Sequence, residues 1–115
     1  MAIQTVTMRN SLCQKYADDA DWMALYTSAP GASAGTEVAG GSPAYARLAS
    51  NWGSPASSVI TATPGAFNVP ASTTLLGAGY HTAVTAGTYL DGASVTSQAF
   101  ASQGTYSPIG TYTQS

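Results

Sequence analysis

Charged side chains are scarce in this chain. Asp, Glu, Lys and Arg make up 7% of its 115 residues, against about 25% in typical soluble domains. Its three basic residues cannot form the patch that neutralises nucleic-acid phosphates. We therefore expect no nucleic-acid partner. A surface of Ser, Thr, Gly, Ala and Tyr has little electrostatic protection against association, which favours a protein that works inside an assembly.

Cysteine and long apolar runs are also nearly absent. Cys13 is the only cysteine, so no intramolecular disulfide can form, and we interpret it as a small buried apolar residue. No apolar stretch is long enough to cross a bilayer, so we expect no membrane insertion. The first residues lack the charged start and apolar core of a signal peptide. We expect a protein that begins at Met1, is made in a cytoplasm and stays there until a larger assembly carries it out.

The sequence lacks the residue combinations of common active and metal sites. His81 is the only histidine, so no second histidine can share a metal. Ser42 lies in Gly-Gly-Ser-Pro rather than in the Gly-x-Ser-x-Gly turn of many hydrolases. Asp18, Asp19 and Asp21 lack the spacing of an EF-hand, which leaves calcium only as a minor alternative. We predict no catalytic residue, no metal site and no cofactor, and hence no enzyme.

The length of the chain suits a single domain spanning 1–115. Beyond residue 52, short alternating segments are separated by turn residues. We predict strands at 59–63, 66–69, 73–81, 87–90, 93–101 and 105–113, with a hairpin turn at Asp91-Gly92. Short strands at even spacing are typical of an all-β, antiparallel β-sandwich, here jelly-roll-like with one short N-terminal helix.

The N-terminal residues 1–9 form the first distinct segment. Ile3, Val6 and Met8 alternate with polar residues, which indicates an arm or a short edge strand. Arms of this kind dock on neighbouring subunits. We therefore include these three apolar residues among the candidate partner contacts.

A helix is predicted directly after this arm. Asn10 and Ser11 are suitable N-caps, and Ser11 with Gln14 fits a capping box. Apolar residues recur at helical spacing from 11 to 20, and this is the only helix we expect. Residues 22–26 are apolar on both faces of an alternating pattern, which indicates a central strand.

A long loop follows at residues 28–43. Pro30-Gly31 opens it, and a double glycine with Pro43 closes it before an alternating segment at 44–52. A connection of this length is commonly functional. Because the loop has one ionisable group, Glu37, we expect it to make contacts rather than to catalyse a reaction.

The aromatic residues divide into two groups. Trp22, Trp52, Phe67 and Phe100 are predicted to fill the core. Five tyrosines lie near turns or on alternating faces, where they serve either an interface or simply the β-propensity of the strands, and both interpretations remain open. These are Tyr45, Tyr80, Tyr89, Tyr106 and Tyr112.

Several motifs together resemble a known family. They are Asp21-Trp-Met-Ala-Leu-Tyr-Thr with the turn at 30–31, Glu37-Val, Gly-Gly-Ser-Pro-Ala-Tyr-Ala-Arg47, Phe67-Asn-Val-Pro, Gly87-Thr-Tyr-Leu and Phe100-Ala-Ser-Gln-Gly-Thr-Tyr. Their order and spacing resemble those of small virion proteins of tailed bacteriophages, best known from phages of actinobacteria and labelled tail fibre, minor tail or minor capsid proteins. The sequence departs from this pattern at Ala29 and at residues 79–82, which bears on partner identity.

The resemblance implies a structural role in the virion. The preferred form is a capsid decoration or minor capsid protein that binds the outer surface of the major capsid lattice and reinforces it. Its partners are then the major capsid protein, further copies of itself, or both, with a trimer as one arrangement. The alternative is a tail-fibre or tail-tip module that contacts the host envelope. A carbohydrate-binding module that takes a host surface glycan is a third class.

The candidate partner contacts are residues that we expect to be exposed on the N-terminal arm, in the long loop or on the face of a strand. They are Ile3, Val6, Met8, Pro30, Gly31, Glu37, Gly40, Gly41, Tyr45, Tyr80 and His81.

Overall fold

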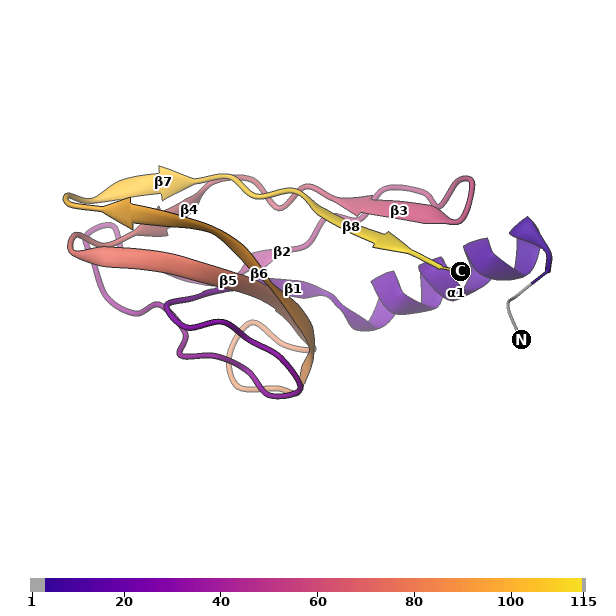
Figure 1. Ribbon diagram of the computed structural model, residues 1–115, viewed down its shortest axis with the longest axis horizontal. Helices are drawn as coiled ribbons and strands as arrows, with labels where there is room; N and C mark the ends of the chain where they lie inside the picture. The colour runs from indigo at the N-terminus through magenta and orange to yellow at the C-terminus, as the bar shows by residue number, and fades with distance from the viewer. Residues whose placement is uncertain (1–3, 115) are drawn as a thin grey trace.

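Antiparallel strands and one helix make up the computed structural model, which describes residues 4–114 (Figure 1). The mostly β composition and the single N-terminal helix confirm the predicted class. In chain order the elements are α1 (Val6–Asp19), β1 (Trp22–Tyr26), β2 (Leu48–Ala49), β3 (Val59–Ala62), β4 (Phe67–Val69), β5 (Thr73–His81), β6 (Tyr89–Phe100), β7 (Gly104–Tyr106) and β8 (Gly110–Thr113).

The largest sheet has four strands in the order β2-β1-β5-β6. Strand β1 lies between β2 and β5, and four of its five residues are buried. This confirms the prediction of a central strand at 22–26. The predicted strand at 73–81 is also confirmed, with the same bounds. The segment at 44–52 instead contributes only the two residues of β2 to the sheet.

The remaining strands form two short antiparallel pairs, β3–β8 and β4–β7, which lie one after the other (Figure 1). We call these four strands together the ribbon. Ala62 pairs with Gly110 in the first pair, and Phe67 pairs with Tyr106 in the second. Pro64 and Pro108 lie in the interval between them. Proline has no N–H for a ladder, which accounts for an interruption at this point. The predicted single strand at 105–113 is therefore wrong.

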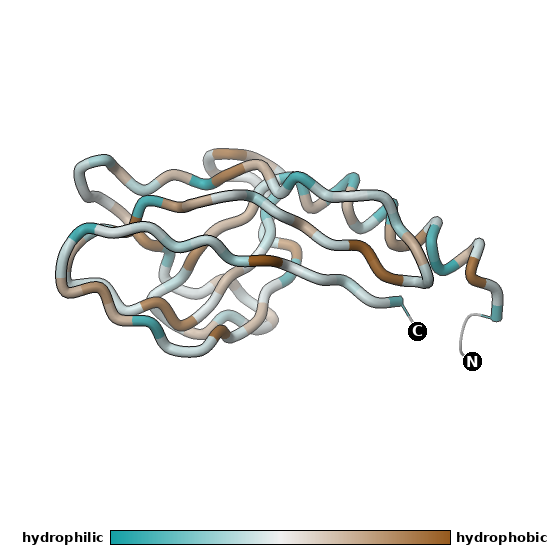
Figure 2. Tube along the Cα trace, turned by 90° about the horizontal axis from the view of Figure 1, so that it is seen from above, coloured by the Kyte–Doolittle hydropathy of each residue, from teal (hydrophilic) through white to brown (hydrophobic). Residues whose placement is uncertain are grey.

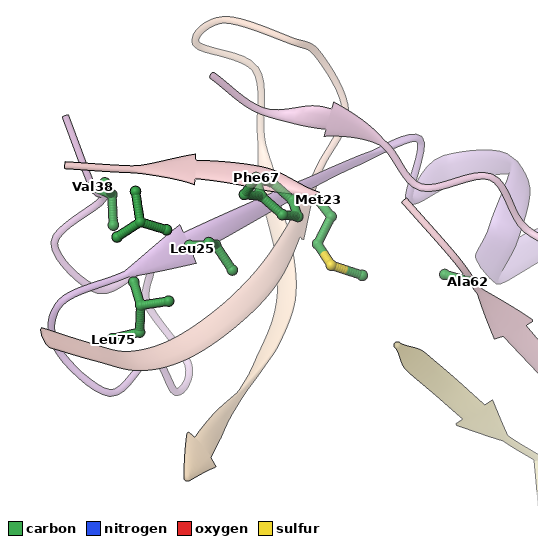
Figure 3. Close-up of a cluster of buried hydrophobic side chains, with 7 residues drawn as sticks. Met23, Leu25, Val38, Ala62, Phe67 and Leu75 are labelled. Carbon is green, nitrogen blue, oxygen red and sulfur yellow. The ribbon is translucent and has the colours of Figure 1, made fainter. Parts of the chain in front are cut away.

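The ribbon lies over one face of the large sheet, so the two layers enclose the main core (Figure 1). Figure 3 shows Leu25, Val38 and Leu75 directed toward one another, with Phe67 beside Met23. These residues are at most 4% exposed. The arrangement is compatible with a β-sandwich, while a jelly-roll connectivity is not confirmed.

The helix begins earlier than predicted, at Val6, with Thr5 as its N-cap. The Thr5 hydroxyl accepts a hydrogen bond from the N–H of Met8 at 3.2 Å. Ser11 lies within the helix and its hydroxyl donates to the Thr7 carbonyl, so the predicted cap at Ser11 is wrong. The prediction of an arm or edge strand at residues 1–9 is therefore wrong from Val6 onward, because Val6 and Met8 are helical, and residues 1–3 lie outside the described residues.

A second, smaller core fixes the helix to the ribbon. Cys13 and Ala17 are buried against Ile60 of β3. This confirms Cys13 as a buried apolar residue. The Asn10 side chain accepts a hydrogen bond from the N–H of Ser58, which ties the helix to the turn before β3.

The predicted hairpin at Asp91-Gly92 is also wrong. Both residues lie inside β6, which pairs with β5 along most of its length. The chain reverses direction earlier, at residues 82–88. The pairing shifts between Tyr80 and His81, where β6 carries an extra residue, Leu90. Long-range pairing with β5 therefore overrides the local turn preference.

The core contains fewer of the large aromatic residues than predicted. Phe67 is fully buried, but Trp22, Trp52 and Phe100 are only partly buried. Tyr26 is instead the largest fully buried side chain. Tyrosine can occupy this position because its hydroxyl has a partner, described below.

The molecule is elongated, with extents of 47 × 24 × 22 Å. Figure 2 shows the helix extending beside the outer end of the ribbon, and most of the chain in pale colours of intermediate hydropathy. Within residues 4–114, no helix is both long and apolar enough to span a bilayer.

Candidate functional site

Two loops, residues 28–43 and 82–88, are joined to one another, and we call their surface the loop face. The second loop and the start of the first lie below the sheet in Figure 1, whereas Val38, later in the first loop, enters the main core. Arg47 joins them. Its Nε and Nη2 donate to the two oxygens of Glu37 at 2.9 and 2.8 Å, and its Nη1 donates to the carbonyls of Ala83 and Ala86 at 2.9 and 2.7 Å.

Tyr45 connects this ion pair to the core. Its hydroxyl donates to Glu37 Oε2 at 2.7 Å and accepts from the N–H of Leu25 at 3.0 Å. Its ring stacks on Phe67 at a centroid distance of 6.2 Å. The position of Glu37 is therefore fixed from the interior of the sandwich as well as by Arg47.

A second polar contact lies beneath the loop face. The hydroxyl of Tyr26 and Nε2 of His81 are 2.5 Å apart, and both residues are buried. Within residues 4–114, Nδ1 of His81 is the only buried side-chain polar atom without a hydrogen-bond partner. The nearby Tyr89 hydroxyl donates to the carbonyl of Gly31 at 2.8 Å, which holds the first loop against β6.

The charges in this network act on one another. Burial alone raises the pKa of Glu37, but hydrogen bonds from Arg47 and Tyr45 and the charge of Arg47 outweigh it and lower the pKa. Burial lowers the pKa of His81, and the charge of Arg47 lowers it further against the influence of Glu37. Burial raises the pKa of Tyr26. At neutral pH the network holds an ionised pair beside a neutral histidine.

A shallow groove of about 330 Å³ runs between the two loops. The Glu37–Arg47 pair lines it, together with Val84, an apolar residue that is about half exposed. No group of three His, Cys, Asp or Glu residues in the described chain is arranged to hold a metal ion. What the groove offers is a firmly held, mostly uncharged surface. Its lining residues are Glu37, Val38, Ala39, Gly40, Tyr45, Ala46, Arg47, Val84 and Thr85.

The structure brings Glu37, Gly40 and Tyr45 together at this groove, but not all as free contacts. Glu37 and Tyr45 are partly buried and hydrogen-bonded to one another, and both line the groove, so their role as partner contacts stays a prediction. His81 is 5% exposed, so its side chain has almost no surface to offer a partner, and the prediction of an outward contact at this residue is wrong. Gly40 and Gly41 are exposed and have positive φ angles of 89° and 98°. Glycine adopts such angles without strain.

Pro30 has an internal role that the sequence did not indicate. Its ring lies against Gly77 and Gly92, where a Cβ atom on either glycine would meet it. The first loop is thus seated on the sheet through Pro30. Gly31 remains exposed, and nothing lies within 4 Å of the position of its absent Cβ.

The other predicted contacts lie away from the loop face. Val6 and Met8 are 49% and 52% exposed on the first turn of α1, at the outer end of the molecule. Ile3 lies outside the described residues. Tyr80 is partly buried between the sheet and the helix, with its ring 5.2 Å from that of Trp52.

Sequence reasoning did not identify Arg47 as the residue that organises the loop face. A signal was present, however, because Glu37 and Arg47 are the only charged residues between positions 22 and 90. Two opposite charges in a long uncharged interval are candidates for a pair, since an unpaired charge in a largely apolar structure is costly.

Comparison of the chain with known protein families, curated proteins and solved structures found no match.

Proposed function

We propose that this protein is a structural component of a tailed-phage virion, a decoration or minor capsid protein that binds the outer surface of the major capsid lattice and reinforces it. The observation that carries the proposal is the Arg47 network, which holds two exposed loops in place. A jelly-roll-like form of the sandwich, assembly into a homo-oligomer such as a trimer, and location on the capsid exterior belong to this proposal.

The loop face has the properties of a preformed contact surface. Arg47 and Glu37 are 10% and 27% exposed at their side chains, so the pair is shielded from water and holds its geometry better than a surface pair. Contact loops supported by a rigid scaffold lose little conformational entropy on binding. Exposed glycines such as Gly40 allow a partner to approach the backbone closely.

The outer end of α1 supplies a second contact. Val6 and Met8 are large apolar residues with about half of their surface in water. The helix end lies away from the loop face along the long axis of the molecule (Figure 1). A molecule 47 Å long with contacts at separate positions can bridge neighbouring subunits of a lattice. Such a ligand stabilises the shell by its binding free energy, because it binds the assembled form alone.

The copy number of this protein in purified virions tests the proposal. We expect a fixed stoichiometric ratio to the major capsid protein, measured by quantitative mass spectrometry. Saturable binding of the purified protein to shells that lack it is the second expected result. A few copies per particle that fractionate with isolated tails would overturn the proposal and favour the tail-fibre or tail-tip alternative. Absence from virions would exclude both.

A further inference from the structure

A slot of about 320 Å³ lies between β6 and β8. Tyr16 and Met23 line it from the helix and from β1. Tyr80, Ala78 and residues 91–95 form one wall, and residues 108–113 form the other. Its volume is at the lower end of the range for ligand pockets.

Asp91 supplies the only formal charge in this slot. Its side chain is exposed, and no Lys, Arg or His is among the lining residues. Asp91 Oδ2 accepts from the hydroxyl of Tyr16 at 2.7 Å, and Oδ1 accepts from the N–H of Gly92 at 2.9 Å. The two ion pairs of the described chain, Lys15–Asp19 and Arg47–Glu37, leave this carboxylate without a cation.

The carboxylate nevertheless keeps acceptor capacity. Its two oxygens offer about four lone-pair sites, of which the two hydrogen bonds use two. The Tyr80 hydroxyl points toward Gly110 on the opposite wall, where a Cβ atom would collide with it. No hydrogen bond joins this hydroxyl to another residue of the described chain. Burial, with a further effect of Asp91, raises the pKa of Tyr80 to about 12, so the hydroxyl stays protonated.

The rest of the lining is uncharged and combines apolar residues with polar ones such as Ser94 and Thr111. Val95 and Pro108 are lining residues, and Ile109 at its edge is 71% exposed, more than any other large apolar residue in the described chain. A slot with one carboxylate and apolar residues beside it matches a long basic side chain. Such a side chain places its methylene stem on apolar surface and its charged group at a carboxylate.

Other ligand classes fit less well. An anion would meet the uncompensated charge of Asp91. A flat sugar ring needs an open aromatic face, but Tyr16 and Tyr112 cover one another, with ring centroids 3.9 Å apart and planes 15° apart. A single carboxylate is also a poor metal site.

We propose that this slot binds an arginine or lysine side chain presented by a partner protein, with the cation at Asp91 and the stem against Ile109 and Val95. This inference rests on the proposed function, which makes the major capsid protein the partner. It adds the chemistry that the capsid surface has to present: a protruding basic side chain in uncharged surroundings.

The direct test is a titration of the full-length protein with N-acetyl-L-arginine amide, followed by two-dimensional amide NMR. N-acetyl-L-citrulline amide is the uncharged control of nearly the same shape. We expect saturable shifts at Gly92, Ser94 and Gly110 with the arginine probe and much weaker binding of the citrulline probe. Equal binding of the two probes, or arginine-induced shifts outside the slot, would overturn the proposal.

Asp91→Asn removes the charge and keeps an acceptor for Tyr16. We expect it to lower the affinity for the arginine probe by about tenfold or more. Asp18→Asn, on the exposed side of α1, is the matched control and should bind as the parent does. Ile109→Lys leaves Asp91 intact and should also weaken the probe, because its own cation competes at the rim. Unchanged affinity in both slot variants would contradict the proposal.

Binding to particles separates this inference from the function on which it rests. Asp91→Asn should decorate shells with lower affinity, and Asp18→Asn should decorate them normally. If Asp91→Asn decorates shells as well as the parent, the slot proposal fails and the virion role stands. If the parent protein itself does not bind shells while the arginine probe fills the slot, the capsid role fails and the basic side chain belongs to another partner.

Discussion

Arg47 donates two hydrogen bonds, of 2.8 and 2.9 Å, to the two carboxylate oxygens of Glu37, ten positions before it in the chain. Arg47 comes directly before β2, and Glu37 forms an isolated antiparallel β-bridge with Tyr26. The third nitrogen of the guanidinium, Nη1, donates to backbone carbonyls of another segment, residues 82–88. One guanidinium therefore defines the arrangement of the loop face.

Arg47→Gln should destabilise the protein by about 2–3 kcal/mol. It leaves the partly buried carboxylate of Glu37 without its cation and the Ala83 and Ala86 carbonyls without their donor. The free energy of unfolding from urea titration measures the loss. Lys15→Gln, which breaks an exposed pair on the helix, should cost under about 0.5 kcal/mol. Equal losses in the two variants would show that the Arg47 network contributes no more than a surface pair.

The stability of the protein should fall as the pH drops through the ordinary range of histidine. Because burial lowers the pKa of His81, the unfolded chain, with a histidine pKa of about 6.5, binds more protons than the folded protein. The contribution of His81 to the free energy of unfolding is complete above about pH 6.5 and is lost as the pH falls toward the lowered pKa of His81 in the folded protein. Tyr26, Glu37, Arg47 and Tyr89 are the groups that face His81.

Urea denaturation at about pH 7.5 and about pH 5.5 measures this dependence. His81→Gln should make the free energy of unfolding nearly independent of pH between these two values. The variant should keep the loss at more acidic pH, because the lowered pKa of Glu37 contributes stability that disappears only when that carboxyl is protonated. A variant curve parallel to the parent curve above about pH 5.5 would mean that His81 does not titrate differently on folding.

Gly77→Ala should destabilise the protein by about 1–3 kcal/mol, since the added methyl group meets the ring of Pro30 and the carbonyl of Ala93. Displacement of Pro30 should also expose the first loop. Gly31→Ala, with nothing within 4 Å of the new methyl group, should have little effect. Thermal unfolding with limited proteolysis compares the two. If Gly77→Ala is as stable and as resistant as Gly31→Ala, Pro30 does not anchor the loop to the sheet.

Trp52 should contribute both packing and one hydrogen bond. Its Nε1 donates to the carbonyl of Ala20 at 2.9 Å, and its ring contacts those of Tyr16 and Tyr80. Trp52→Phe should cost about 1 kcal/mol through the lost hydrogen bond. Trp52→Ala should cost about 3 kcal/mol, because the ring contacts are lost as well. Similar losses in both variants would assign the whole effect to the hydrogen bond.

Val6→Ser with Met8→Ser should weaken decoration of shells and leave the fold intact. Both side chains are about half exposed, so their removal should change the free energy of unfolding by under about 0.5 kcal/mol. Particle binding by cosedimentation measures the loss. Leu90→Ser, 41% exposed but outside the loop face and the helix end, is the control. Wild-type occupancy of the double variant would exclude the helix end as a contact.

Features that depend on neighbouring residues could be predicted from the amino-acid sequence alone. The alternation at 73–81 and the two apolar faces at 22–26 are local patterns, and both became strands where predicted. The burial of Cys13 also follows from its apolar neighbours at helical spacing.

Which distant segments contact one another could not be predicted, because such contacts depend on the tertiary fold. Asp91-Gly92 has the local preference of a turn, but pairing with β5 keeps it extended, because a continuous ladder satisfies more backbone groups than a turn does. Glu37, Tyr45 and His81 looked like surface residues in their local segments. His81 is buried and the other two are partly buried, because segments distant in sequence pack against them, and a buried polar group requires partners that the local sequence does not contain.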